Sequence, residues 1–95
     1  MRSSLVIMIY DVVCDRRRAR LHGLLREYGV PVQKSAFEAR LTPAERRRLV
    51  ADARRMLDAG EDSLILYVIH AGQEAAVETI GRPRPPIDVP EWIVA

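Results

Sequence analysis

Two stretches of the chain, residues 5–10 and 64–69, are apolar at nearly every position. Each is too long for a turn and too short to cross a membrane, and β-branched side chains are common in both. A strand that is apolar along its whole length must be covered on both faces. The pattern therefore predicts two core strands of one sheet, with the carboxylate of Asp11 at the end of the first.

Two further segments carry apolar residues at helical spacing. The spacing in residues 15–28 predicts an amphipathic helix, with Asp15 as its N-cap and Gly29 just past its end. Its apolar positions are Leu21, Leu24, Leu25 and Tyr28.

The second helix has the clearest start in the chain. Thr42 suits the N-cap, Pro43 suits the first helical position, and Glu45 completes a capping box. We expect this helix to end near Gly60. It buries Leu49, Ala53, Met56 and Leu57, and it exposes Arg46, Arg47, Arg48, Arg54 and Arg55. The exposed arginines form either a solvated face or a second binding surface.

Residues 30–41 alternate between the two faces of an extended segment. One face carries Phe37, Ala39 and Leu41, and the other carries Lys34, Glu38 and Arg40. One long bent strand and two short strands with a kink near Ser35 both fit, because no glycine or asparagine marks a turn.

The last part of the chain changes character. Residues 75–80 are a candidate edge strand, and the prolines of residues 82–86 predict a stiff irregular arm. The arm leads to an apolar end that contains Trp92, which we interpret as a final strand or an anchor. We therefore divide the chain into a domain of residues 1–81 and a proline-rich arm of residues 82–95.

The order of these elements predicts an α+β sandwich, with two helices on one face of a small antiparallel sheet. The other face of the sheet would be apolar, and the chain has little left to cover it. We therefore expect a homodimer that packs sheet against sheet. A twofold axis near the end of the first strand would bring two copies of Asp11 together.

Charge is unevenly distributed along the 95 residues. The net charge is +2, but residues 1–55 carry +7 and residues 56–95 carry −5. Fourteen of the 15 basic residues are arginine, which indicates either phosphate recognition or a GC-rich genome. No apolar run approaches the roughly 20 residues of a membrane span, and no signal peptide is evident, so we expect a cytoplasmic protein without membrane contact.

Two features could carry chemistry. Four arginines at the start of the first helix, Arg16, Arg17, Arg18 and Arg20, oppose the helix dipole and so favour an anion there; a solvated charged face is the alternative. Asp11 is either a surface or capping group or, doubled by symmetry, a ligand of Mg²⁺ that also binds substrate phosphate. We interpret His22, His70 and Cys14 as structural, since none has a recognisable partner.

Several motifs, in order, resemble the CRISPR-associated protein 2 family across residues 4–81. They are Tyr10-Asp11, Arg16-Arg17-Arg18, the segment Leu25 to Gly29, Gln33-Lys34-Ser35-Ala36-Phe37-Glu38, and the strand that starts at Asp62-Ser63. The resemblance implies a ferredoxin-like fold, a homodimer with facing sheets, and an extra C-terminal strand that joins the partner's sheet. It also implies a metal site, for Mg²⁺ or Mn²⁺, from Asp11 of each chain.

The same resemblance implies a function. Family members look like metal-dependent endonucleases on RNA or double-stranded DNA, and they bridge the CRISPR integrase during spacer acquisition. Arg18, Arg20, Tyr10, Ser35 and Phe37 match positions associated with substrate handling. The chain departs from the family pattern at Ala36, where valine is usual, and at Pro31, where arginine is frequent.

Three other functions stay open. One is a non-catalytic DNA-binding scaffold of the same adaptation complex, and another is a related toxin-type ribonuclease. A small-molecule sensor of the same fold is the third, although it would not need the excess of arginine. Any binding through these arginines should depend on salt and be nearly blind to sequence, because phosphate contacts carry no base information.

Overall fold

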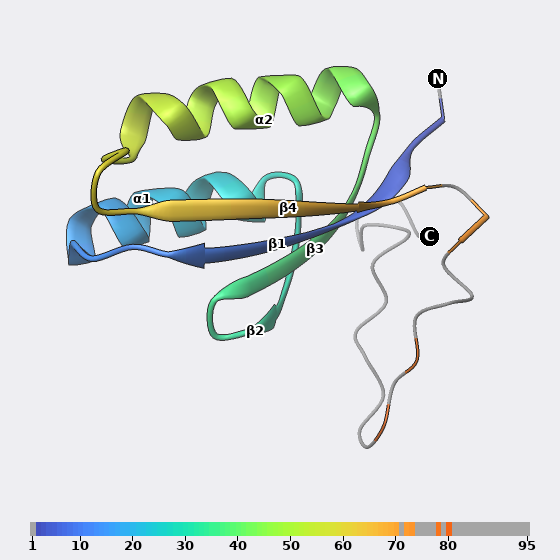
Figure 1. The fold of residues 1–95 in the computed structure, drawn as a ribbon, viewed down its shortest axis with the longest axis horizontal. Coiled ribbons are helices and arrows are strands. Elements are labelled where there is room, and N and C mark those ends of the chain that lie inside the picture. The colour runs from blue at the N-terminus through green and yellow to red at the C-terminus, as the bar shows by residue number, and fades with distance from the viewer. Residues whose placement is uncertain (1, 71, 74–77, 79, 81–95) are drawn as a thin grey trace.

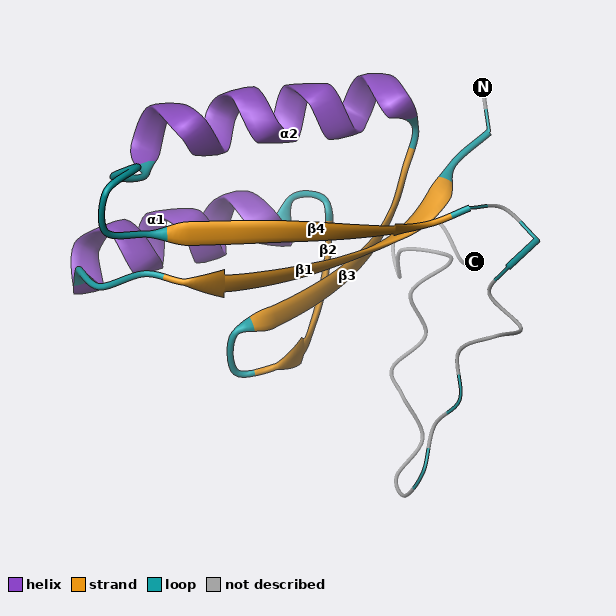
Figure 2. Ribbon diagram, viewed as in Figure 1, coloured by secondary structure: helices purple, strands orange, loops and turns teal. Residues whose placement is uncertain are grey.

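The computed structural model describes residues 2–70, 72–73, 78 and 80, in which two helices cover one side of a four-stranded sheet (Figure 1). The elements in chain order are β1 (Ser4–Asp11), α1 (Asp15–Arg26), β2 (Gly29–Gln33), β3 (Ala36–Leu41), α2 (Pro43–Met56) and β4 (Ser63–Ile69). The strands lie in the order β2-β3-β1-β4, and every neighbouring pair is antiparallel (Figure 2). The predicted ferredoxin-like α+β sandwich is confirmed.

The core lies between the sheet and the two helices. Alternate residues of β1 and β3 face the helices, and both helices turn their leucines toward the sheet. The buried members are Val6, Met8, Tyr10, Val12, Leu21, Leu24, Leu25, Phe37, Ala39, Leu41, Leu49 and Ala53. No helix among the described residues is long and apolar enough to cross a membrane.

Strand β4 is the second of the two predicted core strands, and it lies beside β1 in the same sheet. It pairs with β1 on one side only, so it is an edge strand of the described sheet. Its continuous apolar pattern has another cause. Leu64, Leu66 and Val68 pack against the core, whereas Ile65 and Tyr67, on the opposite face, remain 45% and 52% exposed.

The face of the sheet away from the helices is therefore apolar at its centre. Ile9 of β1 pairs in register with Ile65 of β4, and Ile7 pairs with Tyr67. Ile9 is 42% exposed, which is unusual for the central strand of a sheet. We refer to Ile9, Ile65 and Tyr67 as the open-face cluster.

The segment 30–41 forms two strands rather than one bent strand. Lys34 and Ser35 make a two-residue turn between β2 and β3, and Gln33 pairs with Ala36 across it. The register shifts between Pro31 and Gln33, so the strand leading into the turn is irregular. No non-glycine residue of the described chain has a positive φ, which explains why this turn needs neither glycine nor asparagine.

Both helices differ from prediction at their ends. The N-cap of α1 is Cys14 rather than Asp15, and α1 ends at Arg26, where Glu27 is the C-cap. Helix α2 begins as predicted, with a complete capping box between Thr42 and Glu45, but it ends at Met56 instead of near Gly60. The turn after α2 is stabilised by the Asp58 side chain, which accepts a hydrogen bond from the amide of Gly60. The predicted edge strand 75–80 and the arm 82–95 with its final strand lie outside the described residues, apart from 78 and 80.

Gly29 offers a direct test of the β2–β3 packing. A Cβ atom at this position would lie 2.1 Å from the carbonyl oxygen of Glu38 and 2.7 Å from the Cβ of Ala39. Since backbone cannot yield as a flexible side chain can, we expect Gly29→Ala to lower the free energy of unfolding by about 2 kcal/mol. Urea denaturation at fixed protein concentration measures the change.

Gly23 of α1 provides the matched control for this substitution. Nothing lies within 4 Å of a Cβ built there, and alanine is the better helix former. Gly23→Ala should therefore raise the free energy of unfolding by about 0.5–1 kcal/mol. Equal effects of the two substitutions would contradict the close approach at Gly29.

Candidate active site and nucleic-acid interface

Asp11 lies at the carboxyl end of the central strand β1. It is exposed and pairs in register with Ser63 of β4, and its side chain has no hydrogen bond or ion pair with the described residues. Strand alternation puts its side chain on the same face as Ile9, away from the helices. The carboxylate is therefore accessible at the edge of the apolar open face.

The tip of the β2–β3 hairpin lies beside this strand end. The amide of Tyr10 donates to the carbonyl of Ser35 at 3.1 Å, and the Tyr10 hydroxyl donates to the carbonyl of Lys34 at 3.3 Å. Lys34 and Ser35 are both exposed. The structure thus brings the turn of the Gln33–Glu38 motif next to Asp11, although the two are more than 20 residues apart.

Tyr10 and Phe37, the two aromatic residues predicted to handle substrate, are in the core. Phe37 is fully buried, and the ring of His22 meets it edge-on at a centroid distance of 5.1 Å. Tyr10 is also buried, with its ring 6.4 Å from that of Phe37. In this conformation neither ring can stack on a nucleic-acid base, so any influence of Tyr10 and Phe37 on substrate is through the position of the strand end.

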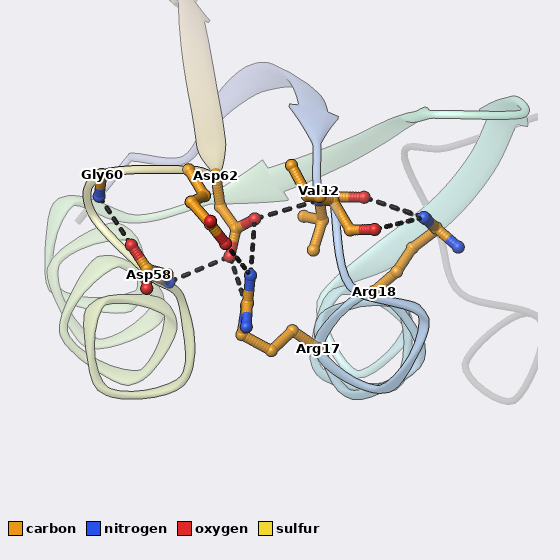
Figure 3. Close-up of polar contacts among 8 residues, drawn as sticks. Val12, Arg17, Arg18, Asp58, Gly60 and Asp62 are labelled. Atoms are coloured by element: carbon orange, nitrogen blue, oxygen red, sulfur yellow. Dashed lines mark hydrogen bonds and ion pairs between the residues drawn. The ribbon is translucent and has the colours of Figure 1, made fainter.

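The four arginines predicted as an anion site divide into two pairs. Arg16 and Arg20 are exposed and make no hydrogen bond or ion pair within the described part of the chain. Arg17 and Arg18 are half-buried and turn back onto the protein. Figure 3 shows Arg18 reaching the carbonyl of Val12, with Nη2 at 2.9 Å and Nε at 3.2 Å.

Arg17 binds a carboxylate that the sequence analysis did not single out as a site. Its Nε donates to Oδ2 of Asp62 at 2.6 Å, and its Nη2 reaches Glu61 at 3.1 Å (Figure 3). The Asp62 side chain is 0% exposed. It also accepts the backbone amides of Val13, at 3.0 Å, and Asp58, at 2.9 Å.

These contacts set the charge state of the pair. The hydrogen bond from Arg17 is the main cause that lowers the pKa of Asp62 far below its usual range, and the two backbone amides add to it. The same hydrogen bond raises the pKa of Arg17. Because the pKa of Asp62 is depressed, the carboxylate is ionised throughout neutral and mildly acidic pH.

The sequence held a signal for this pair. Arginines in the first turn of a helix oppose the helix dipole, so a negative partner was expected. Part of that partner is Asp62, 45 residues away in the chain. Contacts at such a separation cannot be read from local spacing.

Cys14 occupies the N-cap position of α1, but its side chain makes no capping hydrogen bond. The backbone amides of Arg17 and Arg16 at the helix N-terminus lower the pKa of its thiol. His22, one of the two histidines interpreted as structural, is half-buried and packs edge-on against Phe37.

The described residues contain no group of three or more His, Cys, Asp or Glu side chains arranged to hold a metal ion. The exposed carboxylate at the end of β1 is Asp11. Mg²⁺ usually takes one or two carboxylates, together with water and substrate phosphate oxygens. The donor set fits such a site if two copies of the strand end meet.

The fold and this strand end define the class of protein. It is a small ferredoxin-like protein with an exposed carboxylate at the end of its central strand and with Arg16 and Arg20 exposed on the helix that follows.

Comparison with known proteins identifies the family. Residues 4–77 match the family model of CRISPR associated protein Cas2. The chain is 42% identical over 81 residues to CRISPR-associated endonuclease Cas2 2 of Thermus thermophilus, covering 85% of this chain and 86% of the relative. It is 38% identical over 77 residues to CRISPR-associated endoribonuclease Cas2 3 of Chloroflexus aurantiacus, covering 79% and 83%. The chain belongs to the CRISPR associated protein Cas2 family.

A solved structure agrees with this assignment. The crystal structure of Streptococcus pyogenes Cas2 superimposes with a TM-score of 0.69 and 30% sequence identity, over 81% of this chain and 99% of that one. The predicted family resemblance is confirmed. The match also favours a CRISPR protein over the toxin-type ribonuclease and the small-molecule sensor.

Proposed function

We propose that this protein is a homodimeric, metal-dependent endonuclease that cleaves phosphodiester bonds of RNA or double-stranded DNA. The observation that carries the proposal is the exposed Asp11 carboxylate at the strand end, with Arg16 and Arg20 exposed on the adjacent helix. The relatives named endonuclease and endoribonuclease support the same reaction class. We place the protein in the cytoplasm, at spacer acquisition, with the CRISPR integrase as its protein partner.

The chain's own groups have separate tasks in this proposal. Asp11 of each protomer would hold the metal, which when bound polarises the phosphoryl group and lowers the pKa of water. Arg16 and Arg20 bind the phosphate backbone and orient it toward the strand end. The open-face cluster joins the two sheets, so that two strand ends share one site.

The direct test is cleavage of labelled single-stranded RNA and duplex DNA by the purified protein. Cleavage with Mg²⁺ or Mn²⁺ that stops in excess chelator supports the proposal. Cleavage that is unaffected by chelator contradicts the metal site.

A non-catalytic scaffold is the second candidate. One observation favours it: the described residues of a single chain contain no group of three or more His, Cys, Asp or Glu side chains arranged to hold a metal ion. Retained duplex binding without any cleavage would support the scaffold and leave Asp11 without a catalytic role.

The two exposed arginines give a prediction that holds for both candidates. A variant that neutralises fewer phosphates releases fewer counterions on binding, so the slope of log K against log salt falls by about 0.9 for each duplex phosphate that is no longer neutralised. We expect Arg16→Gln and Arg20→Gln each to reduce this slope and to weaken binding on every sequence alike. Fluorescence anisotropy with a labelled duplex, from about 50 to about 200 mM salt, measures it.

A further inference from the structure

The loop of residues 12–14 joins Asp11 to helix α1, and its backbone is held from two sides. The amide of Val13 donates to Oδ1 of Asp62 at 3.0 Å. The carbonyl of Val12 accepts two hydrogen bonds from the guanidinium of Arg18 (Figure 3). Because the Val13 amide and the Val12 carbonyl are both hydrogen-bonded, the loop has little freedom to move. The position of Asp11, which precedes the loop, is restricted with it.

Asp62 connects three segments of the chain through one buried carboxylate. Oδ2 accepts Nε of Arg17 at 2.6 Å and the amide of Asp58 at 2.9 Å, while Oδ1 accepts the amide of Val13 and Nη2 of Arg17 at 3.3 Å. The three segments are the β1–α1 loop, the first turn of α1 and the turn before β4. Asp62 itself directly precedes Ser63, which pairs with Asp11.

We infer that Arg17 and Asp62 are a positioning pair that fixes the Asp11 strand end, and that Arg17 does not bind the nucleic-acid phosphate. The inference rests on the proposed function, because it assigns the pair a task in the same reaction. The guanidinium of Arg17 already donates hydrogen bonds to Asp62 and Glu61. The phosphate contacts are therefore left to Arg16 and Arg20, which are exposed.

The chemistry explains why such a pair matters. Asp11 is exposed and its side chain has no hydrogen bond or ion pair with the described residues, so its position depends on the backbone on either side. The backbone before Asp11 is held by the pairing of β1 with its neighbouring strand, and the backbone after it is the loop that hydrogen-bonds Asp62. A displacement of about 1 Å at a reacting group can cost about 100-fold in rate.

The test compares Arg17→Gln with Arg16→Gln, two neutralisations at neighbouring positions. For Arg17→Gln we expect kcat to fall by about 10- to 100-fold, while KM and the salt slope of duplex binding stay as in the wild type. For Arg16→Gln we expect a lower salt slope and a higher KM, because Arg16 is assigned to the phosphate backbone. A salt slope that falls equally in both variants would make Arg17 a phosphate ligand and overturn the inference.

Asp62→Asn and Arg17→Lys extend the test. Asparagine keeps the shape of Asp62 but removes the charge, and lysine keeps the charge but loses the fork that contacts two carboxylates. We expect both to lower kcat, with Arg17→Lys the milder of the two. Should Asp62→Asn fail to fold, the two Arg17 variants still decide the question.

A readout independent of catalysis separates this inference from the proposed function. The amide of Val13 should exchange slowly with solvent hydrogen in the wild type and at least about 10-fold faster in Arg17→Gln, because its acceptor is no longer held. If the wild type does not cleave nucleic acid, the proposed nuclease fails while faster exchange still supports the pair. Unchanged exchange at Val13, or unchanged kcat in an active enzyme, would overturn the inference.

Discussion

Replacing Asp11 with asparagine is expected to abolish metal-dependent cleavage while leaving the fold intact. The residue is exposed at the end of β1 and lies outside the core, so the amide should be accommodated without rearrangement. The substitution removes the negative charge that a hard cation requires, and in a dimer it does so twice. Metal stabilisation of a transition state is worth several kcal/mol, so we expect the rate to fall by at least about 1,000-fold.

Glu27→Gln is the matched control for this prediction. Glu27 is an exposed carboxylate at the far end of α1 and has no part in the proposed site. Both variants should bind duplex DNA like the wild type, and only the Asp11 variant should lose cleavage of labelled RNA or DNA in Mg²⁺. Cleavage that persists in Asp11→Asn would place the chemistry elsewhere.

Introducing a charge into the open-face cluster is expected to separate the two protomers. Ile65 is 45% exposed and pairs with Ile9 across the face that we propose to be covered by a second copy. Ile65→Lys would bury an unpaired charge in each half of that interface, at a cost of roughly 3–5 kcal/mol. We expect the dimer dissociation constant to rise by at least about 100-fold.

Loss of the dimer should also cost activity, because a monomer keeps only one Asp11. Sedimentation equilibrium over a range of protein concentrations measures association, and the same samples can be assayed for cleavage. Ala51→Lys is the control, since Ala51 is exposed on α2, and α2 covers the opposite side of the sheet from the open-face cluster (Figure 1). A variant Ile65→Lys that stays dimeric would show that the two copies meet through another surface.

The parts of the fold that local rules govern were predictable from the sequence. The capping box of α2 involves residues three apart, and the leucines of α1 report its buried face directly. The position of Asp11 at a strand end followed from the apolar run before it.

The parts that depend on distant residues were not predictable in the same way. The turn at Lys34 and Ser35 uses no positive φ, so it left no glycine or asparagine as a signal. Asp15 satisfied the usual preference for an N-cap, but the cap is one residue earlier, and Asp15 instead binds Arg18 at 2.6 Å. Only part of the candidate site could be predicted from the sequence. Asp11, Arg16 and Arg20 could be named, whereas the role of Asp62 depends on a contact between residues 49 positions apart.

The hydrogen bond between Val13 and Asp62 has a consequence for the folding of the protein during its synthesis. Residues 2–56 contain Asp11, both arginine-bearing helices and three strands, but they lack Asp62 and β4. Until the ribosome has released this last strand, the loop after Asp11 has no acceptor for the amide of Val13. Contacts between distant residues also form late, because closing a long loop costs entropy before the contact is made. A nascent chain therefore contains the proposed metal ligand Asp11 before it contains the residue that holds the loop after it.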